Sequence, residues 1–390
     1  MAPEEKPYRV YRGGRTKGKV PTTPGRPRLK DGTGPRADGA GDYRGPGAIP
    51  ARRKPRWGRR VALGALVLLL LIVAWGVTSW FAFSGGVSDA NARLDPNAKL
   101  ALAPQSGLLI SHPTIILMLG TDNADIVGRT GDRHSDSIQL LRTDPSHHRL
   151  YYLSIPRDIV VPIPGYSTQK INAAFQIGGP ALAIRTIRQF TGLDVNHVIV
   201  VNFGAFKDLI DALGGITVNV PKPIRSNRFD CPYPTQAQCD KWPGWRFEKG
   251  PQHMNGERAL IYSRIRENVL DPSETDFTRG ARQQAVLDAV AAKFTSPLTL
   301  LDLPFDGGSL VKPLTTDLSA GQLMQLGWEK FRSSSSSAVH CRLGGDFGGS
   351  GTGAPSEDNP ATLAMFLGRS APQPPTSQFG PGCVVGHTLQ

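Results

Sequence analysis

The stretch TIILMLGTD, from Thr114 to Asp122, decides the fold class of this chain. Its apolar residues run without a break to Leu119, and Gly120 follows them. A continuous apolar run that stops at glycine is typical of a strand buried on both faces of a sheet. We therefore start from this strand and ask what surrounds it.

Strand and helix patterns alternate along the chain after this strand. Two further strands are predicted over Ser137–Thr143 and Leu150–Ile155, joined by the polar turn Asp144-Pro145-Ser146. The remaining predicted strands are His197–Asn202, Ile216–Val220 and His340–Leu343, and the predicted helices are Asn172–Phe175, Pro180–Thr191, Phe203–Leu213, Gly256–Tyr262, Phe277–Phe294, Ala320–Phe331 and Pro360–Leu367. Residues 221–250 are predicted to be a loop. This alternation predicts an α/β fold with a central mixed β-sheet sandwiched between helices.

A membrane-spanning helix is predicted near the N-terminus. Val61–Phe83 reads VALGALVLLLLIVAWGVTSWFAF and holds no charged residue. At about 1.5 Å per residue it spans about 34 Å, enough to cross a hydrocarbon core of roughly 30 Å. Six basic residues crowd its N-terminal side: Arg52, Arg53, Lys54, Arg56, Arg59 and Arg60. The positive-inside rule then places the N-terminus in the cytoplasm and the C-terminal mass outside the cell membrane.

The alternative is a cleaved signal peptide. Its apolar region is normally 7–15 residues long, and 60 residues do not normally precede it. Trp75, Trp80 and Phe81 lie towards the outer end of the segment, where aromatic rings favour the membrane interface. Both features favour an anchor in a single-pass protein.

The positive charge of the chain is concentrated before this segment. The whole chain carries a net charge of +13, and residues 1–60 contain 17 Lys and Arg against 5 Asp and Glu, which leaves +1 for the rest. The first 60 residues are also rich in glycine and proline, so we predict a disordered cytoplasmic tail that meets anionic lipid headgroups. The near-neutral remainder argues against nucleic acid as a partner.

The expected domain boundaries follow from these segments. We expect a basic tail over residues 1–60, a membrane helix over 61–83, a linker with a helical lead-in over 84–110, a catalytic domain over 111–370 and a C-terminal tail over 371–390. Four cysteines in an exported domain indicate two disulfides. Of the three possible connectivities, we favour the local pairs Cys231–Cys239 and Cys341–Cys383 over the other two. Their spacing, without nearby paired histidines, does not resemble a zinc site.

Two carboxylates lie where predicted strands end. Asp122 follows the first strand, and Asp136 directly precedes the next one. If these strands are neighbours, both carboxylates face one spot, and such an oxygen pair suits Mg²⁺ completed by water and substrate phosphate. The alternative is that Asp122 forms a turn and Asp136 caps a strand.

A set of cationic residues follows the same strand ends. Arg157 comes after the third strand, and Lys170 lies shortly beyond it. Arg264 and Arg266 flank Ile265, so in an extended segment both would point to one side. On the long helix Phe277–Phe294, the residues Arg279, Arg282 and Gln283 share one face. Asp276 is predicted to cap this helix, and Thr316-Asp317 is predicted to cap the helix that begins at Ala320. Guanidinium groups bind pyrophosphate oxygens bidentately. The alternative is surface arginines held in salt bridges.

Taken together, these residues resemble the LytR–CpsA–Psr family of cell-wall glycopolymer ligases, from about Thr114 to Leu287. The resemblance is carried by LGTD (119–122), SDSI (135–138), LSIPRD (153–158), IPG (163–165), KINAAF (170–175), VNF (201–203), DALGGI (211–216), LIYSRIR (260–266), DFTR (276–279) and RQQ (282–284). Each motif is weak by itself, whereas their order and spacing together are specific.

The resemblance implies a function, a cofactor and a set of site residues. Members transfer a phosphorylated glycopolymer from a polyprenyl-pyrophosphate carrier to peptidoglycan, outside the membrane and with Mg²⁺, for which Mn²⁺ is an alternative. The implied metal ligands are Asp122 and Asp136; the implied pyrophosphate ligands are Arg133, Arg157, Lys170, Arg264, Arg266, Arg279 and Gln283; and Arg157, Asp276 and Arg279 are the implied catalytic residues, with Asp276 orienting the acceptor hydroxyl or acting as base. The prenyl chain is expected in an apolar pocket between sheet and helices.

One position departs from the family pattern. The family usually has arginine two residues before the second aspartate, where this chain has His134 with Arg133 beside it. Either Arg133 and His134 both reach the phosphates, or one clamp residue is missing and Arg129 replaces it. Two other functions remain open from the sequence: hydrolysis of the lipid-linked donor, and a non-enzymatic role as a carrier-lipid or wall-binding protein or a regulator.

Overall fold

A computed structural model of the chain describes residues 57–121, 135–265, 267–271, 276–347, 352–377 and 380–386. From Arg59 to Gln390 the chain packs as one unit. Within it, a seven-stranded sheet has the order β11-β6-β1-β2-β3-β12-β15. Its strands are β1 (Ile115–Thr121), β2 (Ser135–Asp144), β3 (Arg149–Ile155), β6 (His197–Asn202), β11 (Thr315–Thr316), β12 (Val339–Arg342) and β15 (Gly382–Val385).

The sheet is mixed, and its register brings several strand ends to one edge. β1 is parallel to β6 and antiparallel to β2, while β3 is antiparallel to β2 and parallel to β12. The C-terminal ends of β1, β3, β6 and β12 therefore meet at one edge, together with the N-terminal end of β2. Ligand sites of α/β proteins form outside such an edge.

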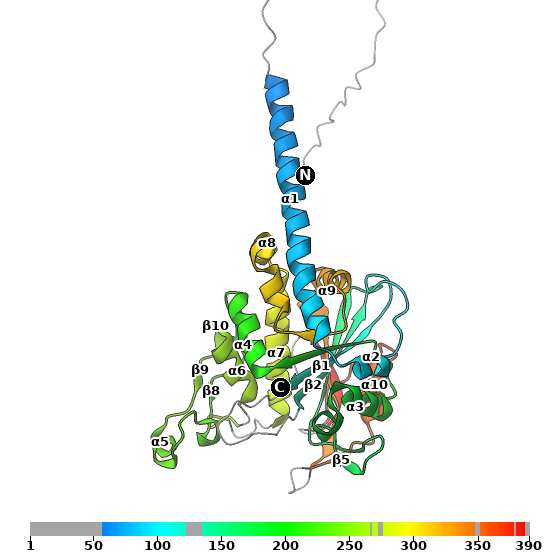
Figure 1. Ribbon diagram of the computed structural model, residues 1–390. Helices are drawn as coiled ribbons and strands as arrows, with labels where there is room; N and C mark the ends of the chain where they lie inside the picture. The colour runs from blue at the N-terminus through cyan, green and yellow to red at the C-terminus, as the bar shows by residue number, and fades with distance from the viewer. Residues whose placement is uncertain are drawn as a thin grey trace, which may run out of the picture. The chain divides into compact units, whose positions relative to one another are not determined.

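Helices cover both faces of this sheet, which confirms the predicted α/β architecture (Figure 1). The longer helices are α1 (Trp57–Ala92), α3 (Ala173–Thr191), α4 (Phe203–Ala212), α7 (Asp276–Phe294), α8 (Pro297–Val311) and α9 (Ala320–Arg332), and the shorter ones are α2 (Pro96–Ala101), α5 (Gln236–Lys241), α6 (Gly256–Arg264) and α10 (Asn359–Phe366). Short strand pairs complete the fold: β4 (Val160–Pro162) with β5 (Thr168–Lys170), β7 (Ile216–Val220) with β10 (Gly250–Met254), β8 (Ile224–Arg225) with β9 (Arg246–Phe247), and β13 (Gly345–Asp346) with β14 (Ala354–Pro355).

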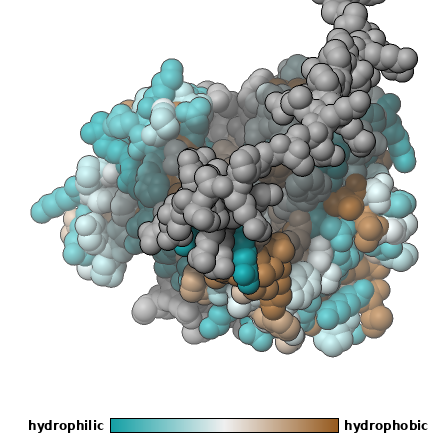
Figure 2. All heavy atoms as spheres, turned by 90° about the horizontal axis from the view of Figure 1, so that it is seen from above, coloured by the Kyte–Doolittle hydropathy of each residue, from teal (hydrophilic) through white to brown (hydrophobic). Residues whose placement is uncertain are grey.

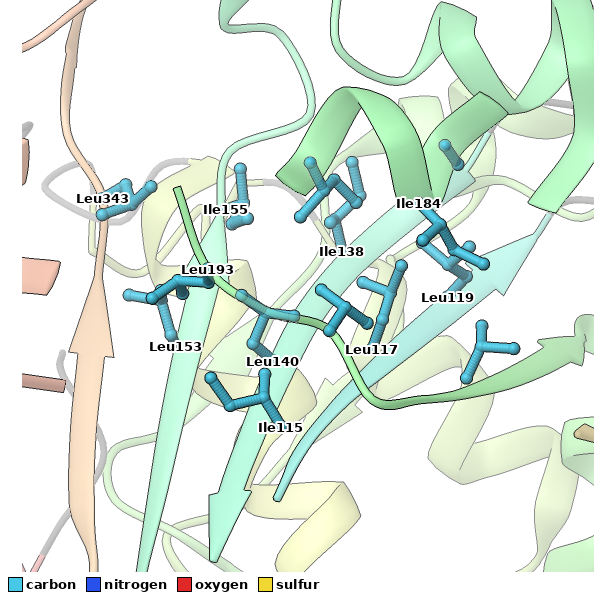
Figure 3. Packing of buried hydrophobic residues seen from close by; sticks show 14 of the residues in the cluster. Ile115, Leu117, Leu119, Ile138, Leu140, Leu153, Ile155, Ile184, Leu193 and Leu343 are labelled. Atoms are coloured by element: carbon cyan, nitrogen blue, oxygen red, sulfur yellow. The ribbon is translucent and has the colours of Figure 1, made fainter. Parts of the chain in front are cut away.

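The main hydrophobic core lies between the sheet and α3. Alternate residues of β1 and β2, among them Leu117, Leu119, Ile138 and Leu140, pack on this face beside Ile184 of α3 (Figure 3). Because side chains alternate along a strand, the intervening residues point to the opposite face. That opposite face is where the cavity described below is found.

The helix α1 is longer than the predicted membrane segment. It continues through Ser84, Gly85 and Gly86 to Ala92, where we expected a linker. Of the described helices, α1 alone has the length and apolar composition needed to cross a membrane. Its C-terminal part packs closely on α8, because a Cβ added to Gly86 would lie 2.6 Å from the carbonyl oxygen of Gly308. This tertiary contact offsets the weak helix propensity of two adjacent glycines.

The helix α8 was not predicted at all. Pro304 and the pair Gly307-Gly308 break the helical pattern in the sequence, yet all three lie inside the helix. Ser296 caps its first turn, and Pro297 occupies the first helical position, where proline is tolerated. The segment Gly382–Val385, expected in a C-terminal tail, likewise forms β15 at the edge of the sheet.

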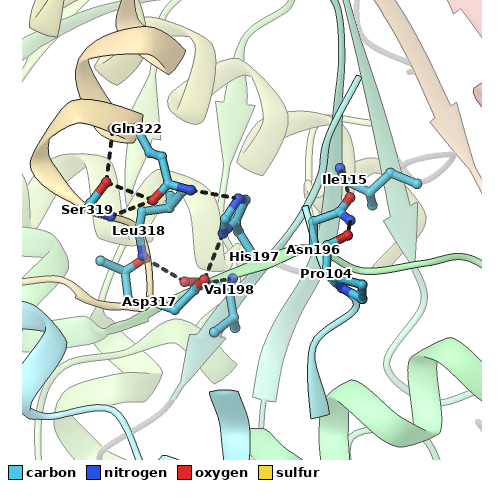
Figure 4. Close-up of polar contacts among 10 residues, drawn as sticks. Pro104, Ile115, Asn196, His197, Val198, Asp317, Leu318, Ser319 and Gln322 are labelled. Carbon is cyan, nitrogen blue, oxygen red and sulfur yellow. Dashed lines mark hydrogen bonds and ion pairs between the residues drawn. The ribbon is translucent and has the colours of Figure 1, made fainter. Parts of the chain in front are cut away.

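The predicted N-terminal cap of α9 is wrong. α9 is capped by Ser319, which forms a capping box with Gln322, and not by Thr316-Asp317. Asp317 instead fastens the start of α9 to β6: its carboxylate accepts from the backbone N–H of Val198 at 2.7 Å and contacts Nδ1 of His197 at 2.7 Å (Figure 4).

The other corrections concern α6 and α7. α6 extends to Arg264, so this arginine does not lie in an extended segment. α7 begins at Asp276, which is therefore its first residue and does not precede it.

Both favoured disulfides are present. Cys231 is bonded to Cys239 across eight residues, and Cys341 to Cys383 across 42 residues. The second bond joins neighbouring residues of β12 and β15, because Cys341 and Cys383 are paired in the sheet register. It therefore ties the last strand to the sheet.

Candidate functional site

A cavity of about 780 Å³ lies between the helices and the face of the sheet opposite α3. Its floor is formed by alternate residues of the strands, including Ser137, Gln139 and Leu141 of β2. Its walls come from α4, α6, α7 and α9, and residues of α1 and α8 close it at one end. This volume is in the range of small-molecule binding sites.

One end of the cavity is polar and lies near the edge where β1, β3 and β6 end. Arg264, Arg279 and Gln283 line it, together with Ser137. Ser137 Oγ donates a hydrogen bond of 2.8 Å to Gln283 Oε1, which fixes the amide against β2. The Arg264 guanidinium lies over the Phe203 ring, 4.5 Å from its centroid. Cations and hydrogen-bonding groups thus converge on one spot, as an anion site requires.

Arg279 is buried, with 8% of its surface exposed, although it is a charged residue at a cavity wall. The glycine after it explains how α7 can bring Arg279 so close to the sheet. A Cβ added to Gly280 would lie 2.8 Å from Ser154 Oγ of β3. Close approach of helix and strand at Gly280 therefore positions the guanidinium.

The other end of the cavity is apolar. Phe83 of α1, Phe294 of α7, Val311 of α8 and Leu323 of α9 line it, with Leu314 between the last two. A ligand that filled the whole cavity would present a charged group at Arg279 and hydrocarbon near Phe83.

A partly buried ion pair lies on the wall between these two ends. Lys330 Nζ donates to Asp288 Oδ1 at 2.5 Å, and the Tyr152 hydroxyl donates to the same oxygen at 2.9 Å. Burial, with the charge of Asp288 and the hydrogen bond to it, raises the pKa of Tyr152 well above its usual value. Tyr152 therefore stays protonated near neutral pH and donates to Asp288. Because Asp288 also pairs with Lys330, this cluster holds α7, α9 and β3 together.

Arg157 and Lys170 form a second cationic group at the same sheet edge. Both pair with Asp158: Lys170 Nζ lies 2.7 Å from Oδ1, and Arg157 Nε lies 3.3 Å from Oδ2. Burial alone would raise the pKa of Asp158, but the hydrogen bond from Lys170 and the charge of Arg157 outweigh it and lower that pKa. Neither cation lines the cavity of about 780 Å³.

The strands β1 and β2 adjoin the predicted metal ligands in the sequence. β1 and β2 are neighbours, as the carboxylate hypothesis required, and Thr121, directly before Asp122, pairs with Ser135, directly before Asp136. A bulge lies here, with Asp136 between the two paired residues Ser135 and Ser137. This backbone arrangement fits a pair of oxygen ligands at one spot. Asp122 itself and the side chain of Asp136 lie outside the described residues, and no cluster of three or more metal-ligating side chains occurs among those that are described.

Several other predicted site residues also fall outside the described part of the chain. They are Arg129, Arg133, His134 and Arg266, and the side chain of Asp276. The question of whether Arg133 or His134 takes the family position therefore stays open. Arg282 is described, and its guanidinium donates to the carbonyl oxygen of Ile265, so it supports the end of α6 and does not face the cavity.

The sequence did not reveal Gln139 as a site residue. Gln139 is 1% exposed and lines the cavity, and neither polar atom of its amide has a partner among the described residues. Asn227 and Asp230 also line the cavity, from residues 221–250 that we predicted only as a loop, and Glu267 lines it from the segment after α6. For Gln139 a signal existed: Ser137 and Gln139 are polar residues at alternate positions that flank the apolar Ile138 of the same strand.

Comparison with known proteins agrees with the geometry. Residues 80–343 match the model of the LytR_cpsA_psr family. The chain is 30% identical over 241 residues to the polyisoprenyl-teichoic acid–peptidoglycan teichoic acid transferase TagV of Bacillus subtilis, and 32% identical over 218 residues to TagU of Bacillus mycoides, which carries the same description. These matches cover 61% and 55% of this chain, and 58% and 64% of the relatives' own length.

Solved structures show the same fold. TagT bound to LI-WTA is 25% identical, with a TM-score of 0.51, over 68% of this chain and 94% of that one. The crystal structure of B. subtilis TagT is 26% identical, with a TM-score of 0.50, over 68% of this chain and 99% of that one. Since the family model also matches more than half of its length, this chain belongs to the LytR–CpsA–Psr family.

Proposed function

We propose that this protein transfers a phosphorylated glycopolymer from a polyprenyl-pyrophosphate carrier to peptidoglycan. The polarity of the cavity carries the proposal, because Arg264 and Arg279 lie at one end and hydrocarbon lines the other. A pyrophosphate head with a long apolar chain fits this distribution, whereas a small polar metabolite would leave the apolar end empty. The relatives' description as transferases of teichoic acid to peptidoglycan supports the same substrate classes.

In the proposed reaction an acceptor hydroxyl oxygen of peptidoglycan attacks the phosphorus that bears the glycopolymer. The bond between this phosphorus and the bridging oxygen breaks, and polyprenyl phosphate leaves. The proton of the hydroxyl passes to a base, a role that we assign to Asp276, the first residue of α7. Arg279 and Arg264 stabilise the charge that develops on the leaving phosphate. Gln283, held by Ser137, orients the phosphate between them.

A divalent cation, Mg²⁺ or Mn²⁺, would be held by Asp122 and Asp136 at the neighbouring ends of β1 and β2. When bound, it would neutralise charge on the phosphate oxygens. Arg157 and Lys170 are proposed to bind the phosphates from the edge of the sheet, with Asp158 holding both cations in place. The basic residues before α1 support an orientation with this domain outside the cell.

The experiment uses the full chain in liposomes with a polyprenyl-pyrophosphate-linked donor and purified peptidoglycan. Arg279→Ala is expected to lower transfer about 10²–10³-fold, the range for loss of one group that stabilises transition-state charge. Arg185→Ala is the matched control, because Arg185 is an exposed arginine on α3. Wild-type transfer by the Arg279 variant would refute the proposal.

Mass spectrometry of the products separates transfer from hydrolysis. Transfer yields polymer linked to peptidoglycan, together with polyprenyl phosphate. Release of free polymer monophosphate at the same rate with and without acceptor would identify a hydrolase instead. Donor binding without turnover at any divalent-cation concentration would identify a carrier-binding protein.

A further inference from the structure

The helix α8 exposes a row of large apolar side chains. Leu298 is 69% exposed, Leu301 62% and Phe305 85%. These residues are three and four positions apart, so they form one stripe on the helix surface. No other described residue covers this stripe. A phenylalanine exposed to that extent beside two leucines indicates a surface that meets a partner.

α8 lies beside the part of α1 that we predict to be in the membrane (Figure 1). The indole Nε1 of Trp75 donates a hydrogen bond of 3.1 Å to the carbonyl oxygen of Leu301. Farther along, a Cβ added to Gly308 would lie 3.1 Å from the carbonyl oxygen of Ala82. Both α1 residues belong to the apolar run Val61–Phe83.

The two contacts also fix the direction of α8. Trp75 and Ala82 are seven residues apart, as are Leu301 and Gly308, so the helices run parallel and in register. By the same register Leu298 lies at the level of Ile72, Leu301 at the level of Trp75, and Phe305 between the levels of Trp75 and Ala82. Trp75, Trp80 and Phe81 are the aromatic residues expected at the membrane interface. The stripe is thus at the depth of that interface.

We propose that the stripe Leu298–Leu301–Phe305 inserts into the outer leaflet beside α1, so that two helices hold the domain on the bilayer. The proposal rests on α1 being the membrane anchor with this domain outside. Asp302 and Asp306 border the stripe and are exposed. Because carboxylates are costly in hydrocarbon, they set α8 at headgroup depth and exclude a spanning position. Viewed from the side where α1 projects, hydrophobic residues form patches among hydrophilic ones (Figure 2).

The insertion also explains how a long apolar chain reaches the cavity. Phe83 of α1, Thr295 two residues before α8, and Val311 at the end of α8 all line the cavity. With α8 in the leaflet, the apolar end of the cavity faces the acyl chains. The prenyl chain of a carrier then passes between bilayer and cavity without crossing water, where its exposure would be unfavourable.

The test measures the depth of α8 in liposomes made with the full chain. The four native cysteines are bonded in pairs, so one added cysteine provides a unique thiol for a fluorescent NBD label. Labels are placed at Leu301→Cys and Phe305→Cys. Leu66→Cys on α1 is the control inside the membrane, and Tyr166→Cys, 56% exposed in the turn after β4, is the control in water.

Nitroxide-bearing lipids quench labels that contact the bilayer. Labels at 301 and 305 are expected to be quenched at least half as strongly as the label at 66 and several-fold more than the label at 166. Quenching at 301 and 305 no greater than at 166 would overturn the proposal. This measurement needs neither donor nor acceptor, so its outcome is independent of the proposed transfer reaction.

A second variant tests the path of the lipid chain. Replacing Leu298, Leu301 and Phe305 together by serine is expected to keep the α1–α8 contact and the cavity wall, because all three side chains are largely exposed, the Trp75 indole binds the backbone oxygen of Leu301, and none of the three lines the cavity. We expect transfer from a donor held in the bilayer to fall at least tenfold, with transfer from a short-chain, water-soluble donor unchanged. Equal rates for wild type and variant with the bilayer-held donor would refute the path.

Discussion

Two adjacent glycines of α1 offer a sharp test of how the anchor joins the domain. Gly85 has open space where a Cβ would stand. At Gly86 a Cβ would lie 2.6 Å from the Gly308 carbonyl oxygen and 2.7 Å from Val311 Cγ2. Replacing either glycine by alanine should raise helix propensity by the same amount, about 1 kcal/mol. The propensity effect therefore cancels when the two variants are compared.

The remaining difference is the overpacking of α8 by the new methyl group. The atoms nearest to it include backbone of Gly308, which cannot turn aside as a flexible side chain can. Overpacking of a tight contact costs about 1–3 kcal/mol. Gly86→Ala is thus expected to weaken the α1–α8 contact by this amount relative to Gly85→Ala.

Hydrogen exchange followed by mass spectrometry measures this loss directly. With 1.4 kcal/mol per factor of ten, the backbone N–H groups of the non-proline residues of α8 should exchange about 5- to 150-fold faster in Gly86→Ala than in Gly85→Ala. The full chain in detergent micelles suffices, and the amides of β1 serve as an internal reference. Equal exchange of α8 in the two variants would refute the inference that α8 packs on α1 at Gly86.

Three further predictions concern the domain itself. Gln139→Met should raise the free energy of unfolding by about 1–2 kcal/mol and weaken donor binding, because it removes a buried amide without a partner among the described residues; a lower unfolding temperature would contradict this. Asp158→Asn should destabilise the protein most at pH 7 and progressively less as the pH falls below about 3.9, since a carboxylate whose pKa is lowered by folding contributes stability above its unfolded value and loses it as the pH falls through its lower folded value; a loss in thermal unfolding that does not shrink as the pH is lowered would argue against the ion pairs. Replacing Cys341 and Cys383 by serine should cost about 4 kcal/mol, against about 2.5 kcal/mol for the other cysteine pair, because the closed loops span 42 and eight residues; denaturant unfolding that gave the reverse order would show that loop entropy does not dominate.

Features that depend on neighbouring residues in the chain could be predicted from the sequence. The strands His197–Asn202 and Ile216–Val220 have the predicted bounds, because a run of β-branched residues between turn signals suffices to define a strand. The family motifs likewise led to Arg264, Arg279 and Gln283, which the fold brings to one end of a cavity. The same motifs could not show that Arg157 and Lys170 pair with Asp158, because this contact joins a strand end to a separate hairpin.

Features that depend on contacts between distant segments came from the tertiary structure. α8 holds Pro304 and two glycines, and nothing in its own sequence predicts a helix; packing of Gly307 and Gly308 against α1 accounts for it. The ion pair of Lys330 with Asp288 joins residues 42 positions apart in the chain. The Gln139 amide, which has no partner among the described residues, is recognised as a cavity group only when the cavity above β2 is known.

By itself, the sequence determined the apolar segment Val61–Phe83, the α/β class and the family, because each depends on local pattern or on motif order. The tertiary structure decided that this apolar helix continues into the domain, that α8 packs on it, and that Phe83 lines the apolar end of the cavity. The physical reason is that close helix packing depends on which small residues of distant segments meet. Composition and periodicity do not carry that information.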